Sequence, residues 1–371
     1  MTRPRIAYVC EGYADIRMLK AFAEVADLSL LIRDADYDAD RVRQAGLDLE
    51  VLRLPSSRIL ALPAIFLRLL ARPTDAVIAL DARGGALAAG LACRLRGRPL
   101  LVQILTDPVA YWDCRPTRGL LHALGRRILS AFLEADLRLA TRVFGMGVHY
   151  RTLLGDRAAK YREVNLYGLD PERLAPIPPG DRPAARASLG LPPAPPLLFY
   201  SSRVAPEKDT ETLLEAAGIL WREGASFTLL NTSGQHREFE ALARRLGLEG
   251  RALSRPAAHP ETELPRYYQA SDLCIQASRA EGFGWSPREA LACGTPVIVA
   301  DVGGLRGDFE GMGLSYPPGD AAALAARIRE ALADPARMQV MADRGRAYVL
   351  GRYGRGKAVA DFAALLEEVG L

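Results

Sequence analysis

Lysine is scarce in this sequence of 371 residues. Only four of its 48 basic residues are lysines, at Lys20, Lys160, Lys208 and Lys357, and the others are arginines. The net charge is only +4, which is too small to indicate a nucleic-acid partner. Because lysine is so rare here, each of the four positions needs its own explanation.

Paired cysteines and long apolar runs are also absent. The five cysteines lie far apart, without a CxxC pair or a zinc-ligand spacing, so we interpret them as small buried side chains in a reducing compartment. No apolar run approaches the ~20 residues that a membrane-spanning helix needs. The sequence opens on a strand-like run, residues 5–10, without a leader pattern. We therefore expect a cytoplasmic protein, with peripheral attachment to the inner membrane face left open.

The glycine-rich dinucleotide fingerprint is missing where a Rossmann dehydrogenase would carry it. The first strand-like run is followed by Glu11, Gly12 and Tyr13, so that Gly12 is the only glycine of this turn. A nicotinamide-dependent enzyme would have GxGxxG at this place. The sequence therefore disfavours an enzyme of that class.

The composition is that of an ordinary globular protein, with 49% hydrophobic and 25% charged residues. The length suffices for two domains, and eight prolines crowd into residues 176–196 between them. We predict an N-terminal domain over 1–170, a stiff linker over 171–196, a second domain over 197–353 and a closing helix over 354–371. Strand and helix patterns alternate, which predicts an α/β protein with doubly wound parallel sheets.

The richest stretch runs from Glu281 to Gly304 and reads EGFGWSPREALACGTPVIVADVGG. A strand over 273–276, a loop, a helix with Ser286 as N-cap and a strand over 297–300 predict a βαβ unit. Loops at the carboxyl ends of such strands bind anions, most often phosphate. Glu281 and Glu289 flank that place and can accept hydrogen bonds from sugar hydroxyls. Alternatively, Glu289 only forms a capping box with Ser286.

This stretch resembles the donor-site signature of the retaining GT-B glycosyltransferases of family 4. The resemblance rests on Glu281, seven intervening residues, Glu289, and the ALACGTPVI and DVGG runs that follow. It implies two Rossmann-like domains facing a central cleft, with a C-terminal helix crossing back to the first domain. It also implies that Glu289 holds a ribose, that Glu281 contacts the transferred sugar in the catalytic site, and that loop amides face the donor. On this resemblance, the donor-binding loop residues would be Gly282, Phe283, Gly284, Gly303 and Gly304.

A second motif of the same resemblance lies at Ser202 to Asp209, which is similar to the family's Gly-Arg-x5-Lys-Gly loop. The resemblance implies that Arg203 and Lys208 bind the donor diphosphate, and charge-assisted bonds of this kind are strong. The alternative for Lys208 is an exposed salt bridge with Glu207 or Glu211, which contributes little. Asp209 replaces a glycine, so we expect a differently shaped loop.

The first half of the chain departs from the family's pattern. The loop at Gly12, which in the family approaches the donor diphosphate, is poor in glycine, and Thr106-Asp107 stands where many members have His-Asp. Asp107 either holds a sugar hydroxyl in the catalytic site or begins the turn before Pro108. Tyr111 and Trp112 are candidates for stacking on an acceptor sugar, and a buried aromatic pair is the alternative.

The acidic run from Asp34 to Asp40 does not predict a metal site. Counting along a calcium loop from its aspartates reaches Ala45, Leu47 or Leu49, and never the required glutamate. We interpret the run as a solvated loop. Since the resemblance also implies catalysis without a bound metal, we expect no metal and no cofactor.

Two segments, Arg58–Arg72 and Arg118–Arg142, combine apolar residues with arginines. Each is either an interfacial helix on an anionic membrane or an ordinary core helix whose arginines reach solvent. The resemblance as a whole implies transfer of a sugar from a nucleotide-sugar donor, with UDP or GDP, to a glycan, lipid-linked or small-molecule acceptor. Two alternatives stay open: an epimerase or phosphorylase on the same fold, and a non-catalytic nucleotide-sugar-binding partner of another transferase. The departures in the first half motivate the second of these.

Overall fold

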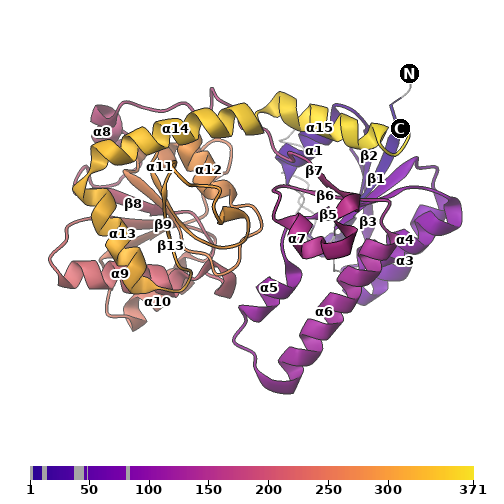
Figure 1. Ribbon diagram of the computed structural model, residues 1–371, viewed down its shortest axis with the longest axis horizontal. Coiled ribbons are helices and arrows are strands. Elements are labelled where there is room, and N and C mark those ends of the chain that lie inside the picture. The colour runs from indigo at the N-terminus through magenta and orange to yellow at the C-terminus, as the bar shows by residue number, and fades with distance from the viewer. Residues whose placement is uncertain (1–2, 11–14, 37–45, 48, 81–83) are drawn as a thin grey trace. The chain divides into compact units, whose positions relative to one another are not determined.

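The computed structural model describes residues 3–10, 15–36, 46–47, 49–80 and 84–371. The chain divides into two compact units (Figure 1). The first contains residues up to 113, 117–168 and 353–371, and the second contains 114–116 and 169–352. Gly12 and the second half of the acidic run lie outside the described residues, so the structure does not address their predicted roles.

The first unit is built on a parallel sheet of seven strands in the order β3-β2-β1-β4-β5-β6-β7. The strand order reverses beside β1, as in doubly wound sheets. Most strands are apolar over their whole length because helices cover both faces. The strands are β1 (Arg5–Cys10), β2 (Asp27–Arg33), β3 (Glu50–Leu54), β4 (Ala76–Leu80), β5 (Leu100–Ile104), β6 (Arg142–Gly145) and β7 (Tyr161–Glu163).

Three helices of this unit, α3, α4 and α6, form one layer, in which α4 contacts both of the others (Figure 1). Their core includes Ala7 and Val9 of β1. Gly90 allows the close approach of α4 to α6, because a Cβ there would lie 2.8 Å from a Leu139 methyl group. The helices are α1 (Ile16–Ala23), α3 (Arg58–Ala71), α4 (Gly85–Arg96), α5 (Pro108–Asp113), α6 (Gly119–Leu139), α7 (Tyr150–Leu154) and α15 (Arg355–Glu367).

The last helix, α15, belongs to the first unit although it follows the second unit in sequence. Its Phe362 stacks on Phe22 of α1, with ring centroids 3.7 Å apart. Asp361 accepts a hydrogen bond from the backbone N–H of Asn165 at 3.1 Å. The expected return of the C-terminal helix to the first unit is therefore confirmed.

The second unit has a parallel sheet of six strands in the order β10-β9-β8-β11-β12-β13. Its strands are β8 (Leu197–Tyr200), β9 (Thr228–Thr232), β10 (Ala252–Arg255), β11 (Leu273–Gln276), β12 (Val297–Ala300) and β13 (Leu314–Tyr316). Its helices are α8 (Arg182–Ser188), α9 (Thr210–Arg222), α10 (His236–Arg245), α11 (Leu264–Ala270), α12 (Trp285–Ala292), α13 (Ala321–Ala333) and α14 (Pro335–Tyr353). The prediction of two doubly wound parallel sheets is confirmed.

The proline-rich segment belongs to the second unit, and its helix α8 is bonded to the sheet of that unit. Arg186 of this helix is buried, donates to the Ala270 carbonyl at 2.9 Å and forms an ion pair with Asp272. Its guanidinium also donates to the Pro193 carbonyl at 2.9 Å. A buried arginine with this many partners ties the segment to the sheet that follows.

Candidate functional site

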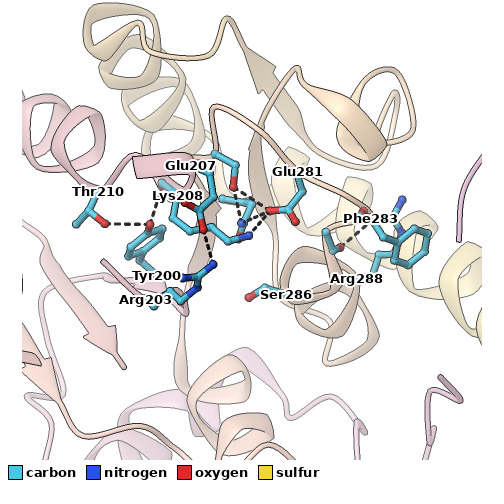
Figure 2. Close-up of polar contacts among 12 residues, drawn as sticks. Tyr200, Arg203, Glu207, Lys208, Thr210, Glu281, Phe283, Ser286 and Arg288 are labelled. Carbon is cyan, nitrogen blue, oxygen red and sulfur yellow. Dashed lines mark hydrogen bonds and ion pairs between the residues drawn. The ribbon is translucent and has the colours of Figure 1, made fainter. Parts of the chain in front are cut away.

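A pocket of about 370 Å³ opens at the carboxyl ends of β8, β9 and β11 in the second unit. Parallel strands place the loops that follow them at one edge of the sheet, which explains why residues far apart in sequence meet here. Figure 2 shows the polar side chains at this edge. The lining residues are Ser201, Ser202, Arg203, Lys208, Thr232, Ser233, Gly234, Gln276, Glu281, Gly284, Trp285 and Ser286.

Lys208 and Glu281 form an ion pair in this pocket, with the ammonium nitrogen 2.7 Å from Glu281 Oε2 (Figure 2). The two side chains are only 16% and 8% exposed. The buried Tyr200 hydroxyl fixes the lysine's backbone by donating to the Lys208 carbonyl at 2.8 Å. Glu207 pairs instead with Arg203, and Glu211 with Arg245 at 2.6 Å. The alternative that Lys208 makes a surface salt bridge with Glu207 or Glu211 is therefore wrong.

The Glu281 carboxylate is held by three donors. Besides Lys208, the Gln276 amide and the Ser278 hydroxyl donate to Oε2 at 2.8 and 2.9 Å. Burial acts to raise the pKa of this carboxyl, but the Lys208 ammonium and the hydrogen bonds outweigh burial, so its pKa lies below the ordinary value. Glu281 is thus ionised at neutral pH and pre-oriented. Sequence reasoning missed Gln276 and Ser278, although they lie only five and three residues before the glutamate.

Arg203 lines the pocket with a largely exposed side chain. It is 60% exposed and pairs with the nearly buried carboxylate of Glu207 four residues later (Figure 2). An exposed arginine can exchange such a partner for an incoming anion at little cost. The arrangement gives the pocket one fixed cation, Lys208, and one adjustable cation.

Asp209 has a left-handed backbone conformation, which glycine adopts more readily than other residues do. Its φ of 50° and ψ of 46° are left-handed, and it is the single non-glycine residue with positive φ within the described ranges. The carboxylate accepts from Thr212 at 2.7 Å and pairs with Arg279 at 2.8 Å, which offsets the strain. These side-chain contacts therefore stabilise a backbone conformation that glycine adopts without strain, and the expectation of a differently shaped loop stays a prediction.

Helix α12 begins at Trp285, two residues earlier than the expected N-cap at Ser286 implies. Gly284, with φ of 80°, is its N-cap, and Ser286 makes no cap hydrogen bond. Instead, the Ser286 hydroxyl lies 2.8 Å from the Tyr268 hydroxyl, which donates to Glu289 at 3.2 Å. Both the Ser286 N-cap and the capping-box alternative are wrong. The side chains of Ser286 and Glu289 instead form hydrogen bonds with the buried Tyr268 of α11. Glu289 does not line the pocket itself, but Tyr268 links it to Ser286, which does.

Arg288 holds the two glycine loops together, and sequence reasoning had given it no role. Its side chain is 1% exposed and pairs with Asp308. It donates to the Gly284 carbonyl at 2.9 Å and the Gly304 carbonyl at 3.2 Å, and its guanidinium lies 3.7 Å from the Phe283 ring centroid. The Phe283 side chain is buried. The backbone carbonyl of Phe283 also accepts a hydrogen bond from Arg288 (Figure 2).

Gly303 and Gly304 close against the loop that carries Glu281. The Gly304 N–H donates to the Glu281 carbonyl at 3.2 Å, so this amide links the two loops. Gly303 has a φ of 51°, and a Cβ on it would lie 2.0 Å from the same carbonyl oxygen. Gly282, between Glu281 and Phe283, is buried. The backbone of both loops is therefore fixed by close packing before any ligand binds.

Replacing Gly303 with alanine is expected to abolish binding of the nucleotide that the family resemblance implies, because the methyl group would force the Glu281 loop away from β12. The control is Gly307→Ala, where φ is 69° but nothing lies within 4 Å of the added Cβ. Both variants carry the strain of a positive φ, of about 1 kcal/mol, and only the first adds crowding. Calorimetric titration with nucleotide compares them. Equal binding by the two variants would contradict the importance of this contact.

The candidates of the first unit have structural partners. Asp107 accepts hydrogen bonds from the N–H groups of Val109 at 2.9 Å and Ala110 at 3.0 Å, so it begins helix α5, as the turn alternative expects. The Trp112 indole donates to the His122 carbonyl at 3.0 Å and packs on Gly125 of α6. Tyr111 is half-buried beside it. A sugar contact by Asp107, Tyr111 or Trp112 stays a prediction.

The described ranges contain no group of three or more His, Cys, Asp or Glu side chains that could hold a metal ion. Asp34 of the acidic run pairs with Arg53 at 2.9 Å. The charged side chains that line the pocket are two cations, Arg203 and Lys208, and one carboxylate, Glu281. This set suits an anionic ligand that also carries hydroxyl groups.

Comparison with known proteins shows which family the second unit resembles. Residues 181–348 match the family model described as glycosyl transferases, group 1. A D-inositol 3-phosphate glycosyltransferase of Kineococcus radiotolerans is 34% identical over 269 residues, which cover 63% of this chain and 61% of the relative. A protein of the same name from Streptomyces bingchenggensis is 30% identical over 276 residues, covering 67% and 60%. The chain thus spans about three fifths of the length of these relatives.

Solved structures extend the likeness to the whole chain. Sucrose-phosphate synthase from Thermosynechococcus elongatus superposes with a TM-score of 0.79 at 22% identity, over 99% of both chains. HepE of Anabaena, solved in complex with UDP-glucose, also gives 0.79 at 19% identity, over 99% of this chain and 100% of its own. At such low identity these likenesses concern the fold. Residues 181–348 therefore belong to the group 1 glycosyl transferases, within a chain that has the GT-B fold over its whole length.

Proposed function

We propose that the protein is a glycosyltransferase that binds a nucleotide-sugar in the pocket of the second unit. The observation that carries this proposal is the buried Lys208–Glu281 pair beside helix α12, at the carboxyl ends of the strands. The pair offers a cation for a diphosphate and a carboxylate for sugar hydroxyls within one pocket. The UDP-glucose bound to HepE supports a UDP-sugar as the first donor to test.

The proposed chemistry breaks the bond between the sugar C1 and the diphosphate oxygen and forms a bond from C1 to an acceptor oxygen. Negative charge then grows on the leaving diphosphate, where Lys208 and Arg203 stabilise it most. In the retaining route the acceptor attacks from the face that the diphosphate leaves, and its proton passes to a leaving phosphate oxygen. Glu281, already ionised and oriented, positions the donor sugar, and Glu289 positions the ribose.

The acceptor in this proposal is a glycan, a lipid-linked sugar or a small molecule. A non-catalytic nucleotide-sugar-binding partner is the second candidate, because Thr106 stands where the family often has histidine and Asp107 caps helix α5. The two functions differ in turnover, not in donor binding. An epimerase or phosphorylase would change the donor without an acceptor.

Calorimetric titration with UDP, GDP, ADP and their sugar conjugates tests the donor site, and product analysis with and without acceptors tests turnover. We expect selective binding of one base family, followed by transfer of its sugar. Binding without turnover on any acceptor would favour the non-catalytic partner. Absence of binding by every nucleotide would overturn the proposal.

A further inference from the structure

Arg279 holds the residues on both sides of Lys208. Its backbone N–H donates to the Glu207 carbonyl at 2.9 Å. Its guanidinium Nε lies 2.8 Å from an oxygen of the Asp209 carboxylate. Because Lys208 stands between these two residues, one residue of another loop holds the chain on either side of the lysine. Arg279 also lies two residues before Glu281, the carboxylate that pairs with Lys208.

The turn at Asp209 depends on its side-chain contacts. Its φ of 50° and ψ of 46° are left-handed, a conformation that residues other than glycine adopt at a cost. The Asp209 side chain is only 4% exposed, so the loss of its partners would leave a buried carboxylate unpaired. Its Oδ2 atom accepts from the Thr212 hydroxyl at 2.7 Å and from Arg279. Of these two partners, Arg279 is the one that comes from a different loop of the pocket.

The conformation of Asp209 also determines where Lys208 lies. Helix α9 begins directly after Asp209, and its Leu213 and Leu214 are fully buried, so the helix cannot move to absorb a change in the turn. A right-handed backbone at Asp209 would therefore displace Lys208 instead. The Lys208 carbonyl would then leave the Tyr200 hydroxyl, which donates to it at 2.8 Å.

Arg279 itself stands outside the donor pocket. It does not line the pocket, and its side chain is 51% exposed. Its guanidinium lies against the turn after β13, where a Cβ on Gly319 would be 3.7 Å from the guanidinium carbon. Arg279 thus contacts the neighbours of Lys208 without facing the place of a ligand. This arrangement is that of a positioning residue.

We propose that Arg279 and Asp209 form a positioning pair, which holds Lys208 in the orientation that binds the donor diphosphate. The proposal rests on the proposed function, because it takes Lys208 as the diphosphate ligand. It adds that the two charged loops of the pocket are coupled. The loop that provides Glu281 also fixes the turn that carries the lysine.

The test is calorimetric titration of the full chain with the nucleotide that binds to wild type. Arg279→Ala should weaken the affinity about five- to tenfold, because Lys208 then occupies its binding position in only a fraction of the molecules. Arg279→Lys keeps the charge but not the planar guanidinium, so it should recover part of the loss. Asp209→Ala should bind about fivefold more weakly than Asp209→Gly, since glycine adopts the left-handed turn without strain.

A second titration separates positioning from general stabilisation. In the Lys208→Ala background, Arg279→Ala should cause no further loss of affinity, because no lysine remains to be positioned. A residue that only stabilises the fold would weaken binding by the same factor in both backgrounds. The matched control is Arg329→Ala. Arg329 is 54% exposed and pairs with Glu223 at the opposite end of α9, so its loss should leave affinity unchanged.

The outcomes distinguish this proposal from the proposed function. If wild type binds no nucleotide, both are overturned. If wild type binds, but Arg279→Ala binds as tightly as Arg329→Ala does, the positioning pair is wrong and the donor pocket stands. The same holds if Arg279→Ala weakens binding equally with and without Lys208. Where Asp209→Ala does not fold, Arg279→Ala still decides, because its half-exposed side chain can be removed without leaving a cavity in the core.

Discussion

Replacing Lys208 with alanine is expected to lower the rate of sugar transfer about 100- to 1,000-fold, as the loss of one preorganised stabilising group does in other enzymes. Lys208 is the fixed cation of the pocket, and its partner Glu281 keeps it in place. Affinity for the nucleoside diphosphate should fall by roughly tenfold or more, because a charge-assisted bond contributes about 1.5–3 kcal/mol. Transfer kinetics and calorimetry measure the two effects.

The matched control for this substitution is Lys357→Ala. Lys357 also pairs with a carboxylate, Asp361, but it is 56% exposed and lies on α15 of the first unit. It should leave donor affinity unchanged. Arg203→Ala should lower donor affinity by an amount between those of the two lysine variants, because the exposed Arg203 side chain exchanges partners more freely. If Lys208→Ala bound nucleotide as tightly as Lys357→Ala does, the proposed donor site would be wrong.

Replacing Arg288 with alanine is expected to destabilise the protein by about 3–5 kcal/mol, the usual cost of breaking a buried ion pair from one side. The carbonyls of Gly284 and Gly304 would lose their donor, and Asp308 would lose its cation. Since 1 kcal/mol shifts the melting temperature of a domain of this size by about 2–4 °C, the fall should be on the order of 10 °C. Differential scanning calorimetry measures it.

Arg244→Ala is the comparison, because Arg244 is 64% exposed and its pair with Glu249 should contribute no more than about 1 kcal/mol. Arg288→Lys keeps the charge but not the planar fork, so it should fall between the two and also serves where the alanine variant does not fold. Melting of Arg288→Ala at the wild-type temperature would show that the two loops do not depend on this side chain.

The secondary structure followed from local signals in most places. The expected strand at Val297–Ala300 agrees residue for residue with β12, because an apolar run between Pro296 and a glycine pair has few alternatives. The strand β7 was missed, since Tyr161–Glu163 is a short edge strand with charged residues and no apolar pattern. The start of α12 was misplaced because Gly284 adopts a left-handed conformation that no local pattern announces.

The charged residues that line the pocket, Arg203, Lys208 and Glu281, were found by motif, but their partners were not. Lys208 stood out by rarity and position, yet its partner Glu281 lies 73 residues away, and only the parallel pairing of β8 with β11 brings the two strands' ends together. In the sequence, Arg288 is only one polar residue of a short predicted helix, and no motif predicts its burial. Its burial depends on Asp308 and on two loop carbonyls that the fold places around it.

The sequence by itself determined the two α/β halves, the family resemblance and the identity of the pocket's charged groups, because periodicity and motif spacing are local properties. The tertiary structure decided which charges pair, that Tyr268 and not a capping box holds Glu289, and that Asp107 begins a helix. It also decided that Leu120, Leu121 and Leu124 of α6 are exposed whereas Leu133 and Leu137 of the same helix are buried. Burial and pairing arise between segments distant in the chain, so no local pattern contains them.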